Sequence, residues 1–170
     1  MNGAATSRSS TEEECLGFCP HNLQSSVDLT NSMNPQVLVS EEETRAYGAK
    51  LVKLWRAGDT VLLEGPLGAG KTTLVRGVLQ ALGHTEPVRS PTFNLIQTFD
   101  TNPPVMHADL YRISSALGIG LEEYIDTHLC LIEWPGRLHG LLDESKAWRV
   151  AIDFVNGGRT AKIAPPIWVA

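Results

Sequence analysis

The chain has 170 residues, and its 14 basic and 19 acidic side chains give a formal net charge of −5. At roughly 100–200 residues per domain, this length predicts one folded domain. Hydrophobic residues make up 42% of the sequence, which is enough for a packed core. The acidic balance argues against binding of nucleic acid through bulk positive charge, so any contact with RNA is expected to be indirect.

Three cysteines, Cys15, Cys19 and Cys130, are too few for a disulfide scaffold, and their odd number is typical of a reducing cytosol. We interpret the first two as free thiols, because no fourth metal ligand follows them at a useful spacing. Cys130 lies in an apolar run and is expected to be buried. The sequence has neither a bilayer-spanning apolar run nor a signal-peptide pattern. We therefore expect a cytoplasmic protein without a membrane segment.

Residues 1–36 are rich in Ser, Thr, Asn, Glu and Gln and have no sustained helical or strand period. Such a segment cannot bury enough apolar surface to offset its ordering entropy, so we predict a disordered extension. Its one basic and four acidic side chains give it a net charge of −3. Residues 37–170 are predicted to form the domain.

The predicted elements of the domain alternate between helices and strands. A capping box at Ser40 and Glu43 begins the first helix, which Gly58 closes, and a second helix is predicted over residues 72–82. Apolar runs predict strands over residues 60–64, 105–108 and 129–132, followed by a hairpin of residues 149–155 and 159–164. This order predicts an α/β domain of the P-loop NTPase type: a mostly parallel sheet flanked by helices, with a C-terminal antiparallel hairpin.

The segment from Gly65 to Thr72 matches the complete phosphate-loop pattern G-x-x-x-x-G-K-S/T, between a predicted strand and a predicted helix. Its glycines allow backbone N–H groups to converge on an anion, and the helix start adds a positive dipole. Lys71 can reach the β- and γ-phosphates of a nucleotide, and the Thr72 hydroxyl can bind Mg²⁺. The pattern predicts nucleotide binding but does not specify a reaction.

Two acidic residues, Asp109 and Glu133, follow predicted strands at the edge of the sheet where ligands bind in α/β folds. Glu133 comes directly after a buried run, the usual place for a carboxylate that anchors Mg²⁺. A helix cap or a surface salt bridge is the alternative for each. His107 shares a strand face with Asp109, so we expect it to orient that carboxylate or to pack, rather than to transfer protons.

Four sequence blocks in a fixed order resemble the TsaE family, small P-loop ATPases required for making threonylcarbamoyladenosine in tRNA. The blocks are residues 58–63 running into 65–73, V-R-S-P-T-F at 88–93, H-A-D-L-Y-R at 107–112, and I-E-W-P at 132–135. The resemblance covers roughly residues 37 to 163. One departure is Pro66, which stands where the family commonly has a polar residue and removes one possible N–H donor to phosphate.

The resemblance implies a function for each of the matched positions. ATP phosphates would be bound by Gly65, Gly68, Ala69, Gly70, Lys71, Thr72 and Thr73. Thr72 and Glu133 would hold Mg²⁺, and Asp109 would act with Lys71 in hydrolysis. Thr92 belongs to a switch-like loop that responds to the γ-phosphate and faces partner proteins. Trp134 would lie near the nucleotide, with packing as its alternative role, and the first helix would bring Glu41 and Thr44 near the base.

The family resemblance also implies partners. ATP hydrolysis would support tRNA modification together with TsaD-like and TsaB-like proteins, with tRNA contacted only through them, and the isolated chain is expected to be monomeric. Two other functions remain open. A small-molecule kinase would need an Arg-rich lid, and no such insertion follows residue 89. The second open function is that of an adaptor protein that binds nucleotide and whose hydrolysis is vestigial.

Overall fold

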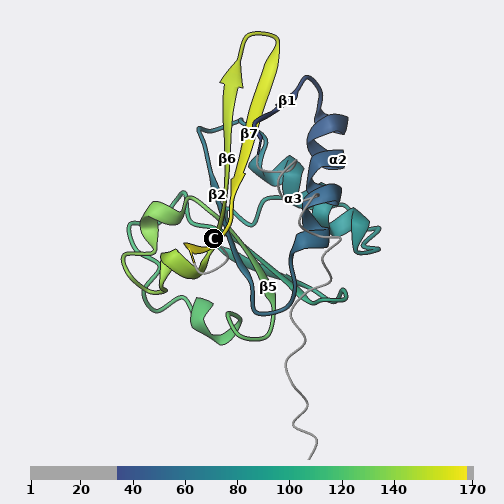
Figure 1. Ribbon diagram of the computed structural model, residues 1–170. Coiled ribbons are helices and arrows are strands. Elements are labelled where there is room, and N and C mark those ends of the chain that lie inside the picture. The colour runs from purple at the N-terminus through teal and green to yellow at the C-terminus, as the bar shows by residue number, and fades with distance from the viewer. Residues whose placement is uncertain (1–33, 168–170) are drawn as a thin grey trace, which may run out of the picture.

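The structure, a computed structural model, describes residues 34–167. Of the extension predicted over residues 1–36, residues 1–33, with Cys15 and Cys19, lie outside the described residues, whereas Gln36 begins a strand that pairs with Ala161, so the predicted boundary is wrong there. One sheet and two α-helices make up the described fold (Figure 1). The strands are β1 (Gln36–Leu38), β2 (Thr60–Glu64), β3 (Ile96–Phe99), β4 (Val105–Asp109), β5 (Leu129–Glu133), β6 (Trp148–Val155) and β7 (Gly158–Ala164). The helices are α2 (Glu41–Leu51) and α3 (Lys71–Ala81), and short 3-10 turns are η1 (Val52–Leu54), η2 (Leu121–Glu123), η3 (Pro135–Arg137) and η4 (Glu144–Lys146).

The sheet has the strand order β1-β7-β6-β2-β5-β4-β3. The four central strands, β6, β2, β5 and β4, are parallel to one another, and the outer pairings β1–β7, β7–β6 and β4–β3 are antiparallel. The α/β class and the closing hairpin are therefore confirmed, and the sheet of the described residues is mixed, with the predicted parallel strands at its centre and antiparallel pairings outside them. The short connections between β3 and β4 and between β6 and β7 account for two of these pairings, because such connections join neighbouring strands in antiparallel orientation.

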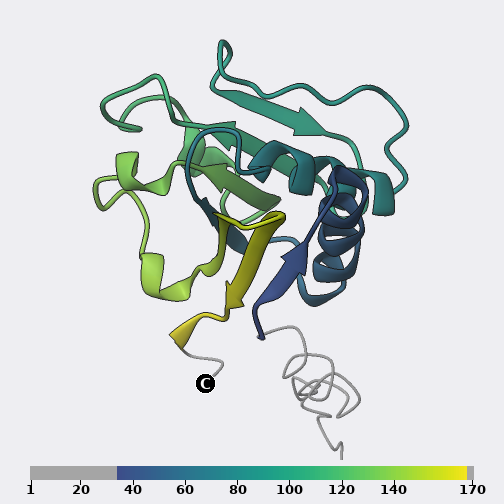
Figure 2. The same ribbon diagram turned by 90° about the horizontal axis from the view of Figure 1, so that it is seen from above.

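The two faces of the sheet are covered differently. Both α-helices pack on one face, against a core that includes Leu63, Leu131 and Val150 (Figures 1 and 2). The other face is covered by the connections around η2, η3 and η4, whose glycines and prolines favour short turns over α-helix. The helices predicted to flank the sheet therefore lie on one face of it. Cys130 is fully buried under these connections, as predicted, and burial raises the pKa of its thiol to about 12.

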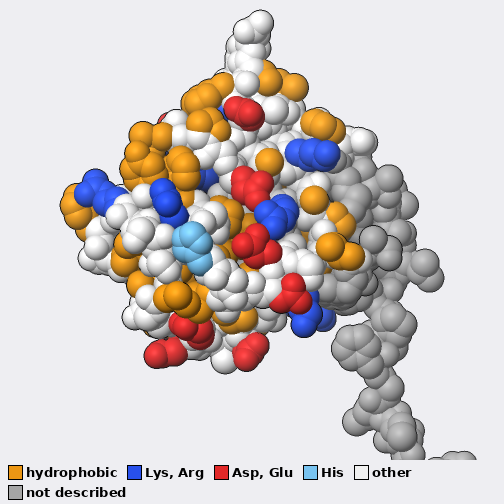
Figure 3. All heavy atoms as spheres, turned by 90° about the vertical axis from the view of Figure 1, so that its left-hand side faces the viewer, with side chains coloured by type: hydrophobic (Ala, Val, Ile, Leu, Met, Phe, Trp, Pro, Cys, Tyr) orange, Lys and Arg blue, Asp and Glu red, His pale blue; other side chains and the backbone are white. Residues whose placement is uncertain are grey.

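The connections that cover this second face present a mixed surface to solvent. Acidic and basic side chains lie next to one another near its centre, with apolar patches around them (Figure 3). Arg149 of β6 pairs with both Glu64 and Glu144, which ties the end of β2 to η4. Among residues 34–167, neither helix is long and apolar enough to cross a bilayer.

The predicted capping box forms at the start of α2, except that the Glu43 carboxylate reaches the N–H of Val39 and not that of Ser40. Ser40 Oγ accepts from the Glu43 N–H at 3.1 Å, and the Glu43 carboxylate accepts from the Val39 N–H at 2.7 Å. The helix ends at Leu51 and a 3-10 turn follows, so the predicted end at Gly58 is wrong. Gly58 instead lies in the turn before β2 with φ of +85°.

The helices α2 and α3 approach closely enough to exclude any side chain at two glycines. A Cβ on Gly48 would lie 2.3 Å from the carbonyl oxygen of Leu74, and a Cβ on Gly77 would lie 2.0 Å from that of Arg45. Each helix therefore packs a glycine against the backbone of the other. This contact fixes α3, and with it the phosphate-loop motif at its start, against the sheet.

We predict that Gly77→Ala lowers the free energy of unfolding by about 1–3 kcal/mol, because the helices must separate to admit the methyl group. Helix propensity alone predicts the opposite sign, about 1 kcal/mol of stabilisation. Gly136→Ala is the control, since a Cβ there meets no atom within 4 Å. Urea denaturation measures both variants. A Gly77→Ala protein at least as stable as wild type would contradict the close contact.

Candidate functional site

One open pocket of about 410 Å³ lies where the phosphate-loop motif meets the carboxyl ends of β4 and β5. Ligands bind at this edge in open α/β sheets, because the parallel strands end there together. Most of the residues singled out from the sequence line it, namely Gly68, Gly70, Lys71, Thr72, Thr73, Thr92, Asp109, Glu133 and Trp134. Leu67, Ser90, Tyr111 and Arg112 complete the lining of the pocket.

The phosphate-loop motif depends on glycine at its two ends. Gly65 has φ of +137°, and a Cβ there would lie 2.0 Å from the carbonyl oxygen of Ile152 on β6. Gly70 caps α3 with φ of +109°, a left-handed conformation that side chains disfavour. Between them, the Ala69 N–H donates to the Pro66 carbonyl at 3.2 Å, which closes the turn. The chain therefore curls tightly before the helix begins.

The side chain of Lys71 lies under this loop. Its Nζ donates to the carbonyl oxygens of Gly65 at 2.8 Å and Pro66 at 2.9 Å. The same ammonium group lies 4.2 Å from the ring centroid of Trp134, a cation–π distance. Burial lowers the pKa of Lys71, and the carboxylates of Glu133 and Asp109 act in the opposite direction. The lysine is thus held beside the pocket, with its charge facing two carboxylates.

Glu133, the last residue of β5, links the start of α3 to β4. Its Oε1 accepts from the Thr72 hydroxyl at 2.8 Å and lies 3.0 Å from His107 Nε2. Glu133 is 3% exposed and His107 fully buried. His107 is packed in the interior, as one of the two expected roles required, but the carboxylate that it contacts is that of Glu133, so the expectation that it orients Asp109 is wrong. The parallel register of β4 and β5 explains this, because it places His107 opposite Leu131, two residues before Glu133.

Asp109, the last residue of β4, is held by the loop before β3. Its Oδ2 accepts from the hydroxyls of Ser90 at 2.5 Å and Thr92 at 2.9 Å. Its Oδ1 accepts from the backbone N–H of Tyr111 at 3.1 Å. The two hydroxyls are themselves 2.6 Å apart. Three donors thus orient a buried carboxylate toward the pocket, and the role of Ser90 in this cluster was not predicted.

The pair formed by Thr72 and Glu133 fits Mg²⁺. This ion prefers oxygen ligands and is usually bound through one or two carboxylates together with substrate phosphates. Thr72 and Glu133 supply a hydroxyl and a carboxylate beside the phosphate-loop motif. Among residues 34–167, no group of three or more His, Cys, Asp or Glu side chains is placed to hold a metal.

Four predicted contact residues lie outside the lining of this pocket. Gly65 and Ala69 belong to the phosphate-loop motif but do not line the pocket, and Ala69 is fully buried. Glu41 pairs with Arg45 at 3.0 Å on the surface of α2, so its contact with a nucleotide stays a prediction. Thr44 comes closer, since its methyl carbon lies 3.5 Å from the position of a Cβ on Gly70.

Comparison with known proteins places these residues in a family. A family model described as "Threonylcarbamoyl adenosine biosynthesis protein TsaE" matches residues 38–161. The chain is 39% identical over 108 residues to the "tRNA threonylcarbamoyladenosine biosynthesis protein TsaE" of Haemophilus influenzae, covering 61% of this chain and 68% of that protein. It is 40% identical over 111 residues to the protein of the same name from Bacillus subtilis, covering 64% and 70%.

A solved structure agrees with the sequence comparisons. The crystal structure of Bacillus subtilis YdiB superposes with a TM-score of 0.67 at 31% sequence identity, covering 78% of this chain and 84% of that one. The family model spans well over half of the sequence. It includes the phosphate-loop motif and the whole of the four parallel strands β2, β4, β5 and β6. The chain therefore belongs to the TsaE family.

Proposed function

We propose that the protein is a Mg²⁺-dependent ATPase that supports the threonylcarbamoyladenosine modification of tRNA. The observation that carries the proposal is the contact between the Thr72 hydroxyl and the Glu133 carboxylate at 2.8 Å. It places an oxygen pair suited to Mg²⁺ at the start of the helix that follows a complete phosphate-loop sequence. Family membership supports the connection to tRNA modification.

The residues of the loop would bind the phosphates of ATP. Backbone N–H groups from Gly68 to Thr73 would converge on the β- and γ-phosphates, and Lys71 would leave the carbonyls of Gly65 and Pro66 to reach them. Thr72 and Glu133 would hold Mg²⁺, which neutralises charge on these phosphates when it is bound. Trp134 would lose its contact with the ammonium group in the same movement.

Asp109 would position the water that attacks the γ-phosphate. Its carboxylate is buried beside the pocket and already oriented by three donors. A γ-phosphate that draws the Thr92 hydroxyl away would change the hydrogen bonds of this carboxylate. The loop around Thr92 would thereby respond to the nucleotide. Phe93, 84% exposed on this loop, would carry the change to the surface.

The proposed partners are TsaD-like and TsaB-like proteins, which would handle the tRNA. The net charge of −5 supports this division, because a protein that grips RNA directly usually carries a basic surface. Phe93 and Arg112 offer partners an exposed contact beside the pocket, with the Arg112 guanidinium 4.4 Å from the centroid of the Phe93 ring.

ATP turnover by the full chain, with and without a TsaB–TsaD complex, tests this function. We expect slow release of phosphate from ATP by the chain alone and faster release with the complex, because partners often complete such sites. Lys71→Ala should lower kcat/KM by about 100-fold or more, since it removes a buried charge beside the phosphates. Lys50→Ala is the control, because Lys50 is exposed on α2. Turnover unaffected by Lys71→Ala, or phosphate transfer to a small acceptor, would overturn the proposal.

Glu133→Gln separates metal binding from nucleotide binding. The amide keeps the size of the side chain but loses the negative charge that favours Mg²⁺. We expect the Mg²⁺ concentration for half-maximal turnover to rise roughly tenfold, while the affinity for metal-free ATP changes less than about twofold. Titrations of Mg²⁺ and of a fluorescent ATP analogue measure the two effects. Equal losses of both would count against a metal-binding role for Glu133.

Asp109→Asn tests the role of the buried carboxylate in hydrolysis. The amide keeps the size of the side chain but replaces one acceptor oxygen with an NH2 donor and removes the charge that orients water, so we expect kcat to fall by about 100-fold. KM for ATP should change little, because Asp109 is not placed to grip the phosphates. Steady-state kinetics measures the two constants. An unchanged kcat would exclude Asp109 from the reaction.

A further inference from the structure

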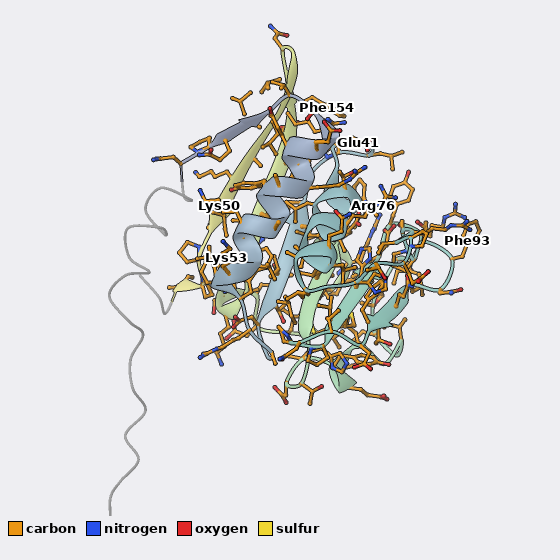
Figure 4. All side chains as sticks on the ribbon, turned by 90° about the vertical axis from the view of Figure 1, so that its right-hand side faces the viewer. Glu41, Lys50, Lys53, Arg76, Phe93 and Phe154 are labelled. Atoms are coloured by element: carbon orange, nitrogen blue, oxygen red, sulfur yellow. The ribbon has the colours of Figure 1, made fainter. Side chains whose placement is uncertain are left out.

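Arg76 joins the helix of the phosphate-loop motif to the loop that orients Asp109. Its Nε donates to the carbonyl oxygen of Val88 at 2.9 Å. Within residues 34–167, this is the hydrogen bond that ties residues 85–89 to another element. Figure 4 shows Arg76 projecting from α3 toward the loop whose tip carries Phe93. The contact therefore holds the start of the loop, which follows α3 in the chain, back against that helix.

The position of Arg76 along α3 matters because residues about one turn apart in a helix keep a fixed arrangement relative to one another. Lys71 and Thr72 begin the same helix, five and four residues before Arg76 respectively. On the other side of the bond, Val88 precedes Ser90 by two residues and Thr92 by four. This hydrogen bond thus helps to fix the position of the hydroxyls that hold Asp109 relative to the residues that face the phosphates.

We propose that Arg76 is a positioning residue for hydrolysis, which holds the loop over residues 85–95 so that Ser90 and Thr92 orient the Asp109 carboxylate. This inference rests on the proposed ATPase function. Without the bond, the start of the loop keeps its connection to the end of α3, where the His84 N–H donates to the Leu79 carbonyl, and the burial of Val88, which is 9% exposed. Asp109 would then lose its fixed orientation, while the phosphate-binding residues of α3 would stay in place.

Two substitutions separate the hydrogen bond from the charge. In Arg76→Gln, the Nε2 amide stands the same number of bonds from the backbone as the arginine Nε, so a donor to Val88 is retained without the positive charge. Arg76→Met has a similar length and no donor. Lys53→Met, which removes a positive charge elsewhere on this side of the molecule, is the control (Figure 4).

We expect Arg76→Met to lower kcat by about three- to tenfold, the range of one lost hydrogen bond, with KM for ATP within about twofold of wild type. Arg76→Gln should restore kcat to within about twofold, as should the Lys53→Met control. Unchanged kcat in Arg76→Met would overturn the proposal. Equal loss in Arg76→Gln would also overturn it, because the charge rather than the bond would then act.

Hydrogen exchange provides a readout that does not require turnover. The Leu95 N–H donates to the Pro91 carbonyl at 2.6 Å inside this loop, so its exchange reports on the loop's order. We expect faster exchange in Arg76→Met and wild-type exchange in Arg76→Gln. Unchanged exchange in both variants would contradict the positioning role. An absence of ATP turnover in wild type, with faster exchange in Arg76→Met, would refute the ATPase function and keep the structural contact.

Discussion

The contact between Thr72 and Glu133 constrains the whole site, because it joins the start of α3 to the end of β5 across 61 residues of sequence. A hydroxyl and a carboxylate can meet there only if the helix begins close to the carboxyl edge of the sheet. The tight curl at Gly65 brings the chain back against β6. The glycines at the α2–α3 contact let the two helices pack closely, which fixes the position of α3. The conformation of the loop and the packing of the two helices thus both determine where the Thr72 hydroxyl meets the Glu133 carboxylate.

The unequal covering of the sheet leaves the site open on one side. The α-helices bury one face with long apolar side chains, whereas the opposite face is buried under turns. The loop before β3 lies at the pocket. It holds Asp109 through the hydroxyls of Ser90 and Thr92, and it exposes Phe93 to solvent. A loop with polar anchors inside and an aromatic side chain outside is suited to report nucleotide binding at the surface. This arrangement is the physical basis for proposing partner-dependent turnover.

Patterns within one element predicted the structure well. The run over residues 60–64 is a continuous apolar strand, as expected for a central parallel strand, and it matches β2. The short strands β1 and β3 were missed because neither alternates clearly: β3 reads Ile-Gln-Thr-Phe, with only Phe99 buried. Contacts that depend on strand register were also beyond reach. The sequence placed His107 beside Asp109 along one strand, whereas the neighbouring strand brings its ring to Glu133.

The central claim is that ATP hydrolysis in this pocket drives repeated rounds of tRNA modification. Threonylcarbamoyladenosine formed per partner complex, counted over many turnovers with either wild type or Lys71→Ala, tests that claim most directly. We predict sustained turnover with wild type and no more than about one round with the variant, because Lys71 is held beside the phosphate-loop carbonyls at the centre of the site. Many rounds at the wild-type rate with Lys71→Ala would contradict the account.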